Sequence, residues 1–211
     1  RVEPVLEALR EASGGRLRGI RHAAGWDADP VIGNAHHGGG QGLYLQDDFR
    51  RGLRRLSEAG LALDALVYHP QHADLLALAR ACPEATVVMN HTGMPLGYGV
   101  YAGKREEVYA QWQAGMTELA ACPNVNLKLG GMMMRLAVYD YNAVDTPISS
   151  QALADHWRPY IEPCIELFGA KRCTFESNFP VDKMGIGYAA LSAEEKEALF
   201  AGTARRVYRL R

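Results

Sequence analysis

Short apolar and β-branched runs alternate along this sequence with longer stretches of helical periodicity. The predicted strands cover residues 17–21, 63–68, 86–90, 125–129 and 173–177. Helical patterns between them cover residues 47–59, 71–81, 105–121 and 151–168. Repeated strand and helix units of this kind predict an α/β fold built around a parallel sheet. Functional residues are expected just after each strand, because the carboxyl ends of parallel strands meet at one edge.

The composition excludes several classes of protein. The 211 residues include 23 basic and 24 acidic side chains, so the basic excess of a nucleic-acid-binding protein is missing. No apolar run approaches the roughly 18–20 residues that cross a membrane, and no signal peptide is recognisable. A cytoplasmic protein with one domain over residues 1–211 is therefore expected. The four cysteines have no paired spacing, so we expect reduced, buried thiols.

Polar and titratable residues recur where the predicted strands end. They are Arg21, His22, His69, His91, Lys128, Glu176 and Asn178, with Asp182 close behind. One histidine at a strand end is most often structural, whereas several groups that converge on one rim favour a functional site. Trp26, which follows the first strand, either forms a wall of the pocket or anchors its loop.

The period-two alternation of strands separates two faces of the predicted sheet. Val125, Leu127 and Leu129 are expected to pack against helices, whereas Lys128 faces inward. On the next strand Glu176 also faces inward. We therefore expect Lys128 and Glu176 to form an interior ion pair, because either charge alone is costly to bury. The alternative is that both side chains reach solvent separately.

Two segments, residues 23–46 and 132–149, are long and irregular. Such loops often act as lids or substrate walls, and simple mobility is an equal alternative for the glycine-rich first one. Its adjacent His36 and His37 lack the usual spacing of zinc ligands. A last helix is predicted from Ser192, because Glu195 completes a capping box with it.

Six motifs resemble the amidohydrolase-2 family, the branch of the amidohydrolase superfamily that contains sugar-lactone and dicarboxylate-lactone hydrolases. They occupy residues 18–22, 67–70, 88–93, 127–131, 175–183 and 204–210. Each is weak alone, but together and in order they span almost the whole chain. The resemblance implies a (β/α)8 TIM barrel with its active site at the carboxyl rim of the strands.

The chain departs from this family in its strand count. By the resemblance, its five strands match the fourth to eighth of the barrel, so the first three β-α units and their His-x-His pair are absent and the domain is N-terminally incomplete. A barrel closes with eight strands, not five. The segment after residue 183 is also shorter than the helix expected there, which suggests that residues are omitted.

Asn178 is a further departure, because the family usually has an aspartate there that binds metal or acts as general base. A carboxamide cannot accept a proton at neutral pH and is a poor zinc ligand. Base catalysis is then expected of Glu176, or of Asp182. A purely structural role for Glu176, as the partner of Lys128, is an equal alternative.

The function implied is hydrolysis of a small lactone or cyclic ester by water attack on the carbonyl. The catalytic candidates are His69, His91, Glu176, Asn178 and Asp182, and the substrate-binding candidates are Arg21, His22, Trp26 and Lys128. No cofactor is required in this interpretation. If a single divalent metal such as zinc is bound, His69 and His91 would be its ligands, short of the three that catalytic zinc normally takes.

Two other functions stay open. One is a catalytically silent barrel that binds a small acidic ligand, which Asn178 favours, and the other is a decarboxylase of the same family. The expected partner is a small-molecule substrate, with neither nucleic acid nor membrane. Barrels of this type often pair, so a homodimer is also an expectation.

Overall fold

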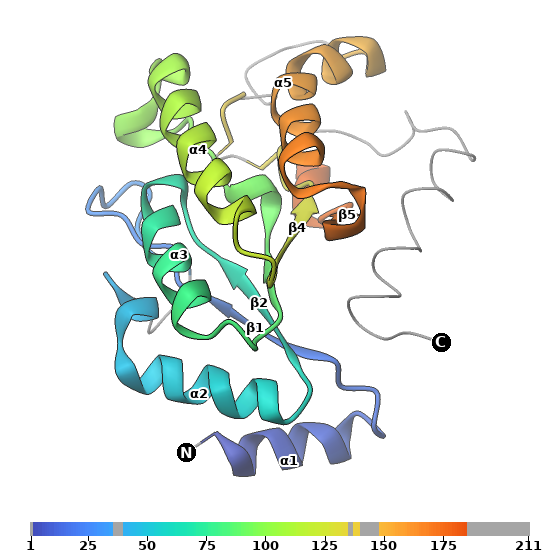
Figure 1. Ribbon diagram of the computed structural model, residues 1–211. Helices are drawn as coiled ribbons and strands as arrows, with labels where there is room; N and C mark the ends of the chain where they lie inside the picture. The colour runs from blue at the N-terminus through green and yellow to red at the C-terminus, as the bar shows by residue number, and fades with distance from the viewer. Residues whose placement is uncertain (1, 36–39, 135–136, 140–147, 185–211) are drawn as a thin grey trace.

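A five-stranded parallel sheet forms the centre of the computed structural model, which describes residues 2–35, 40–134, 137–139 and 148–184 (Figure 1). The strands are β1 (Gly19–Ala23), β2 (Ala62–Leu66), β3 (Val87–Met89), β4 (Val125–Leu129) and β5 (Cys173–Phe175), and they lie side by side in sequence order. Every neighbouring pair is parallel. The predicted α/β class is confirmed, and the match to barrel strands four to eight stays a prediction.

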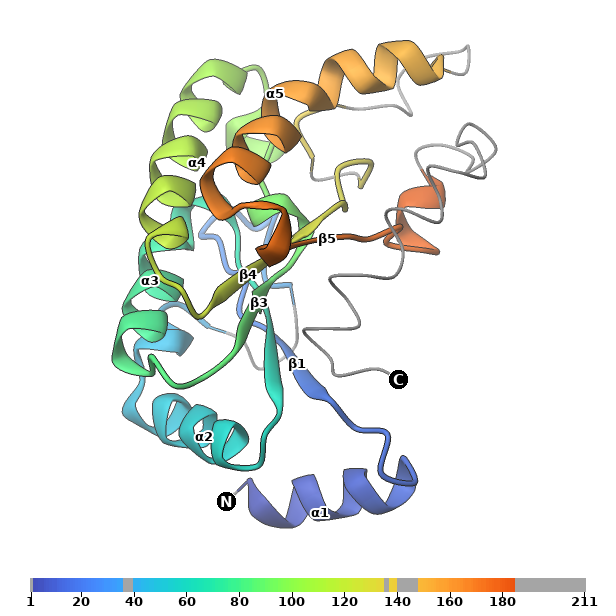
Figure 2. The same ribbon diagram turned by 45° about the vertical axis from the view of Figure 1, so that its right-hand side comes forward.

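Helices follow the strands and cover one face of this sheet. They are α2 (Asp47–Glu58), α3 (His72–Ala81), α4 (Arg105–Ala120) and α5 (Ser150–Phe168). Figures 1 and 2 show these four along the same side of the strands. Short 3₁₀ turns are η1 (Leu43–Leu45), η2 (His69–Gln71), η3 (His91–Gly93), η4 (Gly99–Tyr101), η6 (Ala170–Arg172) and η7 (Val181–Met184). The four helices predicted at residues 47–59, 71–81, 105–121 and 151–168 therefore exist, with their ends within a residue of those expected.

One helix, α1 (Glu3–Ala12), was not predicted. It has a proline in its first turn, an acidic residue at its start and Arg10 in its last turn, all typical of helix ends. Leu6 is its one buried residue. Its short apolar stripe explains why the alternation of strands and helices did not reveal it.

Alternate strand residues make up the core between sheet and helices. From β4, Val125, Leu127 and Leu129 join this core, as the alternation predicted. The helices contribute large side chains such as Trp112 and Tyr160. All four cysteines are free and buried. The other face of the sheet is more polar, because Arg21, Asp64, Lys128 and Thr174 lie there beside apolar residues such as Val88.

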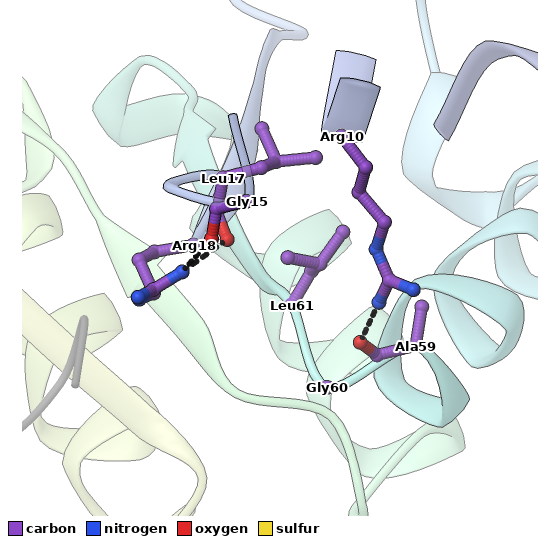
Figure 3. Close-up of a pocket in the computed structure, with 7 residues that line it drawn as sticks. All are labelled: Arg10, Gly15, Leu17, Arg18, Ala59, Gly60 and Leu61. Atoms are coloured by element: carbon purple, nitrogen blue, oxygen red, sulfur yellow. Dashed lines mark hydrogen bonds between the residues drawn. The ribbon is translucent and has the colours of Figure 1, made fainter. Parts of the chain in front are cut away.

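Two hollows lie at the amino ends of the strands. A cavity of about 610 Å³ between α1 and the turn before β2 is lined by residues that include Arg10, Arg18 and Leu61 (Figure 3). Arg10 donates to Ala59 O over 2.5 Å, and Arg18 donates to Gly15 O over 2.8 Å. Both guanidinium groups therefore stabilise loops through hydrogen bonds to backbone carbonyls. A second cavity of about 420 Å³ lies before β3 and β4. Neither contains the predicted site residues.

Some expectations concern parts of the chain that the structure does not describe. His36 and His37, the helix from Ser192 and the motif at 204–210 lie outside the described residues. None of the helices that the structure describes combines the length and apolar character required to cross a membrane.

Candidate active site at the carboxyl ends of the strands

Three side chains from different strands form a continuous hydrogen-bonded chain. Arg21 lies in β1, His91 follows β3, and Glu176 follows β5. Arg21 Nη2 is 2.7 Å from His91 Nε2, and His91 Nδ1 is 2.5 Å from Glu176 Oε1. Because a guanidinium can only donate, Nε2 accepts and the imidazole proton is assigned to Nδ1. Glu176 thus holds His91 in the tautomer that presents an acceptor nitrogen toward Arg21.

Glu176 accepts two hydrogen bonds from His91. The same Oε1 atom also accepts the backbone N–H of His91 over 3.0 Å. Burial raises the pKa of Glu176, but its hydrogen bonds with His91 and the charges of His91 and Lys128 outweigh that effect, so the pKa lies below its ordinary value. A carboxylate with a lowered pKa is a weak proton acceptor. This position therefore suits a residue that orients the base better than the base itself.

Gly130 and Gly131, directly after β4, allow this close packing. Gly131 has a φ of +68°, and a Cβ there would lie 2.6 Å from the Cβ of His91. A Cβ on Gly130 would collide with the backbone of Glu176. Thr92 fixes the same turn, because its hydroxyl donates to Gly130 O and accepts from Gly130 N, each over 3.0 Å. Only glycine fits at these two positions, because a Cβ would collide with His91 or with Glu176.

Backbone strain gathers around the same side chains. Among the described residues, four that are not glycine have positive φ, namely His91 (57°), Thr92 (53°), Met94 (48°) and Asn178 (46°). Such conformations cost about 1–3 kcal/mol each and cluster at functional sites. All four follow β3 or β5, the two strands that His91 and Glu176 follow. The strain is therefore consistent with a site at this rim.

Asp182 and Asn178 form a second polar pair beside His91. Asn178 Nδ2 donates to Asp182 Oδ1 over 2.8 Å. Asp182 is 1% exposed, and its Oδ2 atom has no hydrogen-bond partner among the described residues. Burial raises the pKa of Asp182 to about 6, with Glu176 adding to the shift and Asn178 and His91 opposing it. Asp182 is therefore a carboxyl group that exchanges its proton near neutral pH.

The predicted ion pair between Lys128 and Glu176 is wrong. Lys128 Nζ instead contacts Asp64 Oδ2 of β2, and both side chains are largely buried. Glu176 turns toward His91, whose strained turn brings the imidazole within reach. The alternation along β4 correctly put Lys128 inside, but it did not reveal which of two inward carboxylates would be its partner. Asp64 was missed, although it occupies an inward position of a predicted strand.

Two predicted site residues, His22 and Trp26, have their observed contacts outside this cluster. His22 is next to Arg21 in β1, so its side chain points to the opposite face, where its ring meets Phe49 of α2 edge-on at 5.5 Å. Trp26 is tied through its backbone N–H to the Gln71 side chain over 2.8 Å. The alternation that places Arg21 on one face of β1 places His22 on the other, a consequence that the prediction did not draw.

His69 belongs to a separate small core beneath the loops. It is 3% exposed, its Nδ1 accepts from Leu96 N over 3.3 Å, and its ring lies 4.9 Å from that of Tyr101. Burial lowers its pKa to about 4, and the charge of His72 acts in the same direction. His69 is therefore neutral here and packs against Leu96 and Tyr101, and its catalytic or metal-binding role stays a prediction.

The described residues do not fit a metal site. No group of three histidine, cysteine, aspartate or glutamate side chains within the described ranges could hold a metal ion. The two predicted ligands, His69 and His91, have different contacts, since His69 bonds to Leu96 and His91 Nε2 faces the cationic Arg21. A positive neighbour at this distance opposes a divalent cation.

Active sites of folds with parallel strands and helices lie at the carboxyl ends of the strands, which is where this chain carries its arginine, histidine and carboxylates. Comparison with known proteins agrees, because the amidohydrolase family model matches residues 1–210. The chain belongs to the amidohydrolase family.

Individual relatives extend this assignment. The chain is 31% identical to an uncharacterized protein, y4mH, of Sinorhizobium fredii, over 92% of the chain and 61% of that protein. It is 28% identical to an L-fucono-1,5-lactonase of Burkholderia multivorans, over 100% of the chain and 69% of that enzyme. A crystal structure of a Burkholderia multivorans amidohydrolase with bound zinc superposes with a TM-score of 0.74 at 28% identity, covering 98% of the chain and 69% of that structure.

Proposed function

We propose that this protein hydrolyses a small lactone by water attack on the ring carbonyl. The observation that carries the proposal is the chain from Glu176 through His91 to Arg21. Within this chain His91 Nε2 is an acceptor, and its lone pair becomes available for a proton when Arg21 turns to a substrate. Relatives named as L-fucono-1,5-lactonases support the reaction class at 28% and 33% identity. The substrate itself stays a prediction.

The roles follow from the chemistry of each group. The Arg21 guanidinium binds the carbonyl oxygen or an anionic group of the substrate, since it is the exposed end of the chain. His91 Nε2 takes a proton from water as the new carbon–oxygen bond forms, and returns it to the ring oxygen as the ring carbon–oxygen bond breaks. Glu176 stabilises the imidazolium between these steps. The product is an open-chain hydroxy acid.

Asp182 is the second proton-carrying group of the proposal. Its carboxyl lies close enough to His91 and Glu176 for both charges to change its pKa. Asn178, at the position where the resemblance leads one to expect an aspartate, holds Asp182 through its amide. The neutral amide avoids a third adjacent carboxylate, whose charge would be repelled by the other two.

A panel of sugar lactones and dicarboxylate lactones tests the proposal, with acid release followed at constant pH. Wild-type protein is expected to open at least one lactone, and His91→Gln is expected to lose about 10²–10⁴-fold in kcat. The predicted ligand-binding function would instead give saturable binding of an acid without turnover. Carbon dioxide release would identify the decarboxylase. Either outcome would contradict the lactonase proposal.

A further inference from the structure

An ion pair crosses the inner face of the sheet below the proposed site. Asp64 lies in β2 and Lys128 in β4, so their contact spans the intervening strand β3. The β3 residue in register with Asp64 is Val88, which offers no polar atom at this level. The two side chains are only 14% and 15% exposed. The proposed reaction steps use neither charge.

Lys128 has a second carboxylate within its range. Thr174 of β5 is the register partner of Lys128, and Glu176 follows two residues later, so it lies on the same face and nearer the carboxyl rim. The charge of Lys128 already acts on Glu176. A lysine side chain has a flexible four-carbon stem and a compact charge, so its ammonium group can turn from one carboxylate to the other.

The two pairings have different consequences for His91. When Lys128 is held by Asp64, Glu176 Oε1 is available for the backbone N–H and the Nδ1–H of His91. An ammonium on Glu176 would draw this carboxylate toward β4 and away from those two donors. We propose that Asp64 is a positioning residue, which holds Lys128 on the β2 side and so reserves Glu176 for His91. This inference rests on the proposed function for its catalytic meaning only.

The test uses Asp64→Asn, which keeps the shape of the side chain and removes its charge. Lys128 is then expected to turn to Glu176, so that kcat falls about tenfold or more while KM changes little. Asp64→Asn/Lys128→Met removes the competing ammonium as well, and kcat is expected to recover at least partly. Asp48→Asn is the matched control, because Asp48 pairs with Arg51 on the surface with 83% of its side chain exposed.

A spectroscopic readout separates positioning from simple support of the fold. In histidine-labelled protein, the Nδ1–H of His91 is expected as a downfield proton resonance, assigned by its loss in His91→Gln. It should disappear in Asp64→Asn, return in the double variant, and persist in Lys128→Met. If Asp64→Asn fails to fold, the resonance and kcat of Lys128→Met still test the inference. Retention of the resonance and of kcat in Asp64→Asn, or their loss in Lys128→Met, would overturn the inference.

The same spectrum distinguishes this inference from the proposed function. It requires no substrate, so the expected pattern of resonances would support the positioning role even if wild-type protein opened no lactone. Conversely, lactone turnover with an unchanged resonance in Asp64→Asn would leave the lactonase proposal intact and remove the role of Asp64.

Discussion

At the scale of single residues, the site is defined by which atom donates and which accepts. Arg21 has no acceptor, so its contact fixes the tautomer of His91, and the carboxylate of Glu176 holds that tautomer from the other side. Glu176 and Asp182 are both carboxyl groups, yet their pKa values move in opposite directions. Environments that separate two carboxyl groups in this way are typical of acid–base chemistry.

Asp182→Asn tests the raised pKa through protein stability. Because the folded state binds this proton more tightly than the unfolded state, the stability that Asp182 contributes is complete below the ordinary pKa of 3.8 and is lost as the pH rises through about 6. The asparagine variant escapes this loss. Its advantage in free energy of unfolding over wild type should grow by about 1 kcal/mol between pH 5 and pH 8, measured in urea. A constant difference would show that the Asp182 pKa is not raised.

Arg21→Lys tests the substrate-binding end of the chain. Lysine keeps the charge but loses the planar fork that binds an oxygen and the imidazole together. We expect kcat/KM for a lactone to fall about 10-fold to 100-fold, mainly through KM. Arg51→Lys, on the exposed face of α2, serves as the control. Equal activity of the Arg21 variant and wild type would remove Arg21 from the site.

At the scale of elements, the turns after the strands decide the geometry. The turn after β3 carries His91 and Thr92 in left-handed conformations, and Trp112 of α4 fixes it by donating from Nε1 to Thr92 O over 2.8 Å. The turn after β4 supplies the glycines against which His91 packs. Contacts from α4 and from the turn after β4 therefore fix the turn that carries His91.

Gly131→Ala is expected to impair both stability and catalysis. The positive φ disfavours alanine by about 1–2 kcal/mol, and the added Cβ would push against the His91 ring. We expect kcat to fall with the loss of the contact to Glu176. Gly103→Ala is the matched control, because Gly103 also has positive φ but nothing within 4 Å of the added carbon. If both variants lose kcat equally, contact with His91 is not the cause.

The elements show how far the sequence alone could predict this structure. Alternation correctly separated the core face of β4 from the inward Lys128, because side chains of a strand alternate strictly. The same rule assigns His22 to the helix side, which the prediction overlooked. The partners of Glu176 and His69 could not be predicted, because they depend on turns with positive φ and on loops that pack over the strand ends.

At the scale of the whole molecule, the described strands form an open sheet with β1 and β5 at its edges. The relative from Sinorhizobium fredii is longer, and the part that aligns with this chain is 61% of its length. The inward face of the sheet is polar at several levels, whereas barrel interiors are mostly filled by branched aliphatic side chains. This polarity extends the functional region below the rim, to Asp64 and Lys128. The predicted homodimer stays a prediction.

The most direct test of the proposed site measures the turnover of one lactone by the wild-type protein and by Glu176→Gln. Glutamine keeps the shape but cannot stabilise an imidazolium, so kcat should fall by about 10²–10⁴-fold. Glu162→Gln, which removes an exposed partner of Arg158 on α5, should retain full activity. Wild-type turnover by the Glu176 variant would contradict the central role given to the pair of Glu176 and His91.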